Sequence, residues 1–167
     1  LNMYIGANIP LSHYDLDEAH EFRTSTGCIA GIEGAYFLNP YVGIGGRATV
    51  SETHIITDDT HAEKNSADAF SIMSGAYFSY PITDRWLVGS KLIGGYVRYS
   101  KLELEYGTKI ESEGRAGFGT GLSFTYKVRE HYNIRFFLDY NLMGPHRLQS
   151  GEWMSSMTTG SSFGISF

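Results

Sequence analysis

Hydrophobic and polar residues alternate along most of this chain, in segments of about ten residues each. A period of two is typical of a β-strand with two different faces, and the 3.6-residue period of a helix fails almost everywhere. In the clearest segment, Ile134, Phe136 and Leu138 alternate with Arg135, Phe137 and Asp139. The alternation predicts eight strands, over residues 1–11, 25–37, 42–50, 70–80, 86–97, 115–128, 132–143 and 156–167.

The segment 86–97 departs from this simple pattern, because it carries apolar residues on both faces. One face holds Trp86, Val88, Leu92 and Tyr96, while Leu87, Ile93 and Val97 lie on the same face as Lys91. A β-bulge, which shifts the facing of a strand by one residue, is one explanation for this pattern.

The connections between the segments are short after the second, fourth and sixth segments and have ten or more residues after the others. This regular alternation predicts an all-β fold, an eight-stranded antiparallel up-and-down transmembrane β-barrel. A soluble lipocalin-like carrier, with its apolar face turned inward, is the alternative. The polar face favours the membrane barrel, because it is rich in Gly and Ser, which suit a narrow interior. Apolar-face aromatic residues also gather near the short turns, as in an interfacial girdle: Tyr36, Phe78, Tyr80, Trp86, Tyr126, Tyr132 and Phe167.

Composition excludes several other classes of protein. The chain contains no run of 18 apolar residues, the length that a helix needs to cross a bilayer. The formal net charge of -5 argues against a nucleic-acid binder, which needs clustered Lys and Arg. Cys28 is the only cysteine, so neither an intrachain disulfide nor a cysteine-rich metal site is possible. We expect residues 1–167 to form a single barrel domain that begins after a cleaved signal or inside a longer precursor.

The chain ends with Phe163, Ile165 and Phe167 at alternate positions. With these residues and its eight segments, the whole chain resembles the small outer-membrane barrel superfamily that includes the OmpA membrane domain, OmpX and OmpW. The resemblance implies a protein of the Gram-negative outer membrane, surrounded by its lipid, with periplasmic termini and extracellular long loops. It also implies that the terminal aromatic pattern is the signal read by the barrel-assembly machinery.

Charged residues occupy the face that this arrangement turns inward. Inside a dry, filled barrel each charge must be paired or hydrogen-bonded. We therefore predict a lumenal charge network, similar to the charged plug of the OmpA barrel, built from Glu33, Arg47, Lys91, Arg115, Arg135 and Asp139. Such a network is either a structural interior or a gate for ions, and eight strands leave no room for an open channel.

The long connections between these segments carry 14 of the 18 acidic residues and only 6 of the 13 basic ones. They also hold or border five of the histidines: His13, His20, His54, His61 and His146. The leading hypothesis is a non-enzymatic barrel, without catalytic residues, cofactor or metal, whose loops contact a surface, a ligand or an envelope or extracellular protein. One alternative is a lipid-modifying barrel enzyme that uses these histidines. Another is the C-terminal barrel of a longer envelope protein, such as a barrel-tailed type-2 phosphatidic acid phosphatase.

Overall fold

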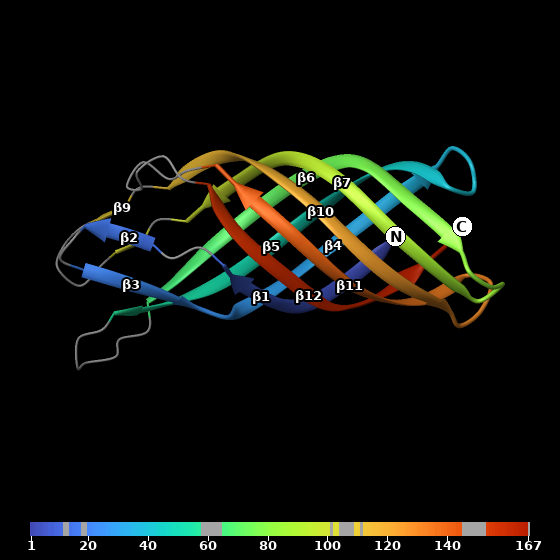
Figure 1. Ribbon diagram of the computed structural model, residues 1–167, viewed down its shortest axis with the longest axis horizontal. Helices are drawn as coiled ribbons and strands as arrows, with labels where there is room; N and C mark the ends of the chain where they lie inside the picture. Colours follow the sequence, from blue (N-terminus) through green and yellow to red (C-terminus); the bar gives the residue numbers. More distant parts are fainter. Residues whose placement is uncertain are drawn as a thin grey trace.

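The computed structural model describes residues 1–11, 14–17, 20–57, 65–100, 102–103, 109–110, 112–144 and 153–166. Eight long strands close into an antiparallel barrel, which confirms the fold expected from the sequence. Each strand pairs with the next, and the last pairs with the first (Figure 1). The barrel strands are β1 (Asn2–Pro10), β4 (Gly27–Phe37), β5 (Val42–Thr57), β6 (Asn65–Pro81), β7 (Trp86–Tyr99), β10 (Glu113–Lys127), β11 (Tyr132–Met143) and β12 (Met154–Ile165).

Three tight turns lie at one end of the barrel, called the turn end here, and the longer connections lie at the opposite, loop end (Figure 1). Polar side chains fold two of these turns. The Asn39 Oδ1 atom accepts hydrogen bonds from the backbone N–H groups of Tyr41 and Val42, both at 2.9 Å. Thr83 plays the same part in the next turn, where its Oγ1 accepts the N–H of Trp86 at 3.1 Å. The first and last described residues also lie at the turn end, because Leu1 N donates to Ile165 O and Ser166 N donates to His131 O beside the turn between β10 and β11, both at 2.8 Å.

Four short strands extend the fold at the loop end: β2 (Tyr14–Asp17), β3 (His20–Ser25), β8 (Leu102–Glu103) and β9 (Lys109–Ile110). Strand β3 continues the line of β4 along β5, and β2 pairs with β3. Strands β5 and β6 are longer than the alternation predicts, because their ladder continues to the pair Ile55 and Asn65. Backbone hydrogen bonding continues beyond the apolar segment, so only residues 58–64 separate these strands, fewer than the ten or more expected.

The barrel turns its apolar residues outward and its polar residues inward. Phe136 and Leu138 on β11 keep 56% and 46% of their surface exposed, whereas Asp139 beside them keeps 1%. This is the reverse of a soluble carrier, whose apolar side chains surround an internal ligand. An apolar outer wall is what a hydrocarbon environment requires of a closed barrel. No helix among the described residues has the length and apolar character needed to cross a membrane.

Strand β7 has no bulge, so that explanation of its two-sided pattern is wrong. Its ladders with β6 and β10 run without a register shift from one end to the other. Ile93 and Val97 instead point into the barrel and join a buried apolar cluster with Met73 and Tyr77. The alternation fails in β7 because this part of the interior is filled by apolar side chains.

Aromatic side chains ring the outer wall near the turn end, as the sequence predicts. Trp86 packs against Phe124 and Tyr126, with ring centroids 4.7 Å and 4.6 Å apart. Tyr132 stacks on Phe163 at 5.8 Å. Such amphipathic rings are typical of the boundary between hydrocarbon and water.

Candidate functional site

Glycines on one strand make room for the large side chains that cross the narrow interior. A Cβ atom on Gly121 would collide with the Oδ1 atom of Asp139 and lie 3.0 Å from the Cε atom of Lys91. One on Gly117 would lie 2.7 Å from Val97 and 2.8 Å from Met73. The inward glycines of β10 therefore provide the space in which charged and apolar side chains meet.

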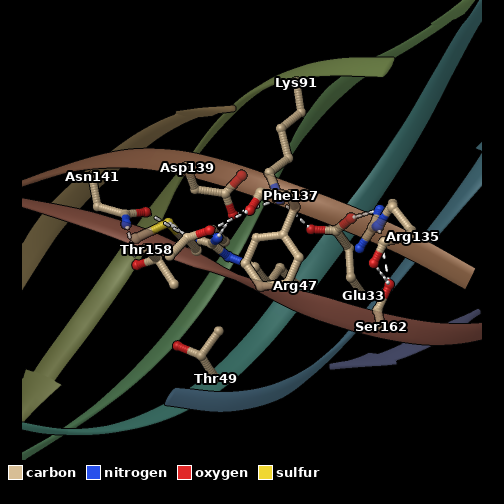
Figure 2. Close-up of polar contacts among 12 residues, drawn as sticks. Glu33, Arg47, Thr49, Lys91, Arg135, Phe137, Asp139, Asn141, Thr158 and Ser162 are labelled. Atoms are coloured by element: carbon tan, nitrogen blue, oxygen red, sulfur yellow. Dashed lines mark hydrogen bonds and ion pairs between the residues drawn. The ribbon is translucent and has the colours of Figure 1, made fainter. Parts of the chain in front are cut away.

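Four ion pairs join five of the six predicted charged residues across the lumen (Figure 2). Arg47 Nη1 lies 2.7 Å from Asp139 Oδ2, and Lys91 Nζ lies 2.9 Å from the same oxygen. Lys91 Nζ also lies 2.6 Å from Glu33 Oε2, and Arg135 Nη1 pairs with Glu33 Oε1. These residues come from β4, β5, β7 and β11, so the charge network connects walls that are far apart in the sequence.

The charge network continues into uncharged side chains that the sequence analysis did not single out. Arg47 Nη2 donates to Asn141 Oδ1 at 2.7 Å. Asn141 Nδ2 donates to Thr158 Oγ1 at 3.1 Å, and that hydroxyl donates to Asn8 Oδ1 at 3.4 Å. Their only signal in the sequence is a place on the polar face of their strands, and many other residues share it. The hydrogen-bonded chain thus reaches β12 and β1.

The network combines three cations with two carboxylates, all of them largely withdrawn from water. In a medium of low polarity, a carboxylate is tolerated when several donors surround it. Asp139 and Glu33 each face two cations, so removal of either carboxylate would leave buried positive charge without compensation.

Arg115 is the predicted member that these four ion pairs do not include. It points inward from β10, opposite Val97 of β7. Gly121, six residues further along the same strand, is the residue that lies opposite Lys91 and Asp139. Arg115 therefore belongs to a level nearer the loop end than the charge network.

The apolar cluster of Met73, Tyr77, Ile93 and Val97 occupies the β6 and β7 side of the lumen. Ala69, Tyr99 and Met143 pack against it. A second group of buried residues, Tyr4, Ile29 and Phe137, lies across the interior. Lys91 Nζ is 5.9 Å from the centre of the Phe137 ring, so the cation also contacts an aromatic face.

A cavity of about 610 Å³, called the vestibule here, lies on the turn-end side of the charge network. Glu33, Lys91 and Arg135 line its inner part, and Lys127 and Glu130 line its rim at the turn between β10 and β11. The charge network therefore separates this space from the loop end of the barrel.

Two of the five histidines near the long connections lie in described strands. His13, His61 and His146 lie outside the described residues, and His20 and His54 are placed only by their strands, β3 and β5. Within the described ranges, no group of three or more His, Cys, Asp or Glu side chains could hold a metal ion.

The terminal aromatic pattern lies on the outer wall as far as the structure describes it. Phe163 and Ile165 are exposed on β12, and Phe167 lies outside the described residues. Through its contact with Tyr132, Phe163 is part of the belt of aromatic side chains that surrounds the barrel near the turn end.

Comparisons with known proteins place this architecture in a group of bacterial membrane proteins. The family model described as the outer membrane protein beta-barrel domain matches residues 1–167. Neisserial surface protein A is similar in structure, with a TM-score of 0.64 and 15% identity over 99% of this chain and 97% of that one. OprG from Pseudomonas aeruginosa has a TM-score of 0.62 and 12% identity, over 98% and 91%. Ail of Yersinia pestis, in complex with the heparin analogue sucrose octasulfate, has a TM-score of 0.53 and 14% identity, over 97% and 96%. No curated protein matches the chain.

Proposed function

Because this chain belongs to the outer membrane protein β-barrel domain family, we propose that it is a non-enzymatic barrel that conducts no ions and holds long loops at the cell surface. The barrel serves as a membrane anchor, surrounded by outer-membrane lipid. The loops contact a surface, a ligand or another envelope or extracellular protein.

The charge network is the observation that carries this proposal. Charged nitrogen atoms of Arg47 and Lys91 both lie within 2.9 Å of the Asp139 Oδ2 atom inside a narrow lumen. An ion that crossed the barrel would have to separate these pairs in a region of low polarity, which is strongly unfavourable. An eight-stranded barrel is also just wide enough for its interior to be filled by side chains.

The connections support an orientation for the barrel. In outer-membrane barrels the short turns are periplasmic and the longer loops are extracellular. On that pattern, the turn end and both termini of this chain face the periplasm. Phe163 and Ile165 then lie at the periplasmic end of the last strand, and with Phe167 they make the signal that the barrel-assembly machinery would bind.

The charge of the long connections favours a basic partner, or one bound through divalent cations. The sequence between the apolar segments at the loop end, residues 12–24, 51–69, 98–114 and 144–155, carries 14 acidic and 6 basic residues. Ail was solved in complex with a polyanion, but loops with this charge balance would repel such a ligand. We therefore propose that the loops bind basic surfaces.

Planar bilayer recording tests whether the lumen is closed. We expect the refolded barrel to give no stepwise current above that of the bilayer alone. The double variant Glu33→Ala, Lys91→Ala removes the inner part of the network and is expected to introduce brief openings. Arg98→Gln on the outer wall is the matched control and should remain silent. Regular openings of the wild-type barrel would show that the lumen conducts.

The non-enzymatic part of the proposal is tested on membranes. Mass spectrometry of outer-membrane lipids should give the same species with and without expression of the barrel. A new acylated, deacylated or dephosphorylated lipid that appears only with expression would instead support the lipid-modifying enzyme.

A further inference from the structure

The vestibule is a blind pocket with a charged inner wall. Its volume is about 610 Å³, and its lining extends from Lys127 and Glu130 at the turn-end rim to Lys91 and Arg135 at the charge network. Polar side chains of Ser123 and the neighbouring strands line the walls between rim and network. The pocket is therefore large enough for a small polar molecule and its hydration water.

The inner wall of the vestibule presents positive rather than negative charge. The side chains of Lys91 and Arg135 keep 8% and 12% of their surface exposed, whereas Glu33 between them keeps 1%. All three side chains line the vestibule, and the two cationic ones keep the larger exposed fractions. The charge network also has one more cation than carboxylate, so its excess charge is positive.

A buried hydroxyl without a partner adds a second, independent observation. Tyr77 lines the vestibule and is only 6% exposed. Its hydroxyl has no hydrogen-bond partner among the described residues. A buried polar group that forms no hydrogen bond carries a substantial free-energy penalty, which a bound acceptor would remove.

We propose that the vestibule is a binding site for a small oxyanion, in which Lys91 and Arg135 supply the positive charge and Tyr77 donates a hydrogen bond. A carboxylate or phosphate oxygen suits all three donors, and its negative charge neutralises the excess cation of the network. With the turn end in the periplasm, the anion comes from that compartment. The site is separate from the loops and goes beyond the anchoring function proposed above.

Calorimetric titration of the refolded barrel in non-ionic detergent tests this site. The probes are inorganic phosphate, acetate and chloride, compared at constant ionic strength. We expect one phosphate to bind per barrel, with chloride at least about ten-fold weaker because it makes poorer use of directional donors. A preference for acetate over phosphate would identify the carboxylate as the natural chemistry. Absence of binding by both oxyanions, or equal binding of all three probes, would overturn the proposal.

Position 125 provides a matched pair of variants. Thr125 points into the vestibule directly opposite Arg135 in the β10–β11 ladder. Thr125→Glu places a permanent carboxylate beside that guanidinium, so phosphate binding should fall below detection. Thr125→Gln has the same size without the charge and should bind phosphate within about three-fold of wild type. Equal phosphate binding by both variants would contradict the electrostatic origin of the site.

Two tyrosines on opposite faces of β6 provide a second matched pair of variants. This pair tests the oxyanion site even if Thr125→Glu does not refold. Tyr77→Phe removes the vestibule hydroxyl and should weaken phosphate binding by about ten-fold, as expected for one lost charge-assisted hydrogen bond. Tyr80→Phe removes a hydroxyl from the outer wall near the same end and should leave binding unchanged. Unaltered phosphate affinity of Tyr77→Phe would exclude the proposed donor.

Discussion

The charge network and the apolar cluster fill the same narrow lumen by opposite means. The network fills its part of the lumen with ion pairs, in which Asp139 and Glu33 each contact two cations. The cluster fills its part with Met73, Ile93 and Val97, whose only requirement is that their shapes fit one another. A buried charge without its partner is far more costly than a small defect in apolar packing. The two regions should therefore respond very differently to single substitutions.

The largest effect is expected from Asp139→Ala. This variant leaves Arg47 and Lys91 without the oxygen that both contact, and we expect a loss of about 3–5 kcal/mol in the free energy of unfolding. Urea titration in detergent, followed by the difference in gel migration between boiled and unboiled samples, measures it. The double variant Arg47→Met, Asp139→Leu removes a cation together with the carboxylate and should lose less than the single variant. A larger loss in the double variant would contradict this account of the network.

Gly121→Ala comes next in size and tests the space beside the network. The added methyl group collides with Asp139, so the carboxylate must shift away from its partners. Overpacking of this kind costs about 1–3 kcal/mol, which the same urea titration detects. Gly94→Ala on the outer wall is the control, because its methyl group meets the Phe118 ring at 3.3 Å and the Gly117 carbonyl oxygen at an ordinary contact distance of 3.7 Å. Equal losses for the two glycine variants would show that the inward space has no special role.

The smallest effect is expected in the apolar cluster. Ile93→Val removes one methylene from a buried side chain, which costs about 0.5–1.5 kcal/mol. The unfolding midpoint should therefore move much less than in Asp139→Ala. If Ile93→Val destabilised the barrel as much as the loss of Asp139, the contrast between the two regions would be wrong.

Much of the barrel could be predicted from the alternation of residues, because lipid and lumen impose opposite demands on neighbouring positions. Asp139 and Glu33 could be assigned to the interior for that reason. The ion pairs could not be predicted, since Glu33 and Arg135 are 102 residues apart and meet only through the register and tilt of the closed sheet. Ile93 and Val97 violated the pattern, because an interior packed with side chains accepts apolar groups as well as polar ones.

The ends of β5 and β6 could not be predicted from the alternation of apolar and polar residues either. Glu52 and Asp68 lie opposite each other in a ladder that continues past the apolar wall. Side-chain alternation shows where a strand is surrounded by lipid, whereas backbone hydrogen bonds determine where it ends. The vestibule likewise left no signal in the sequence, because it depends on how far individual side chains reach across the lumen.

The facing of β11 is tested most directly by quenching of tryptophan fluorescence with brominated lipids. Two single-tryptophan barrels are compared after Trp86 and Trp153 are both replaced by Phe. One carries Phe136→Trp on the outer wall, and the other carries Phe137→Trp in the lumen. Strong quenching at position 136 and almost none at position 137 is the result that this structure predicts. The reverse order would show that the charged face, and not the apolar one, is turned toward the lipid.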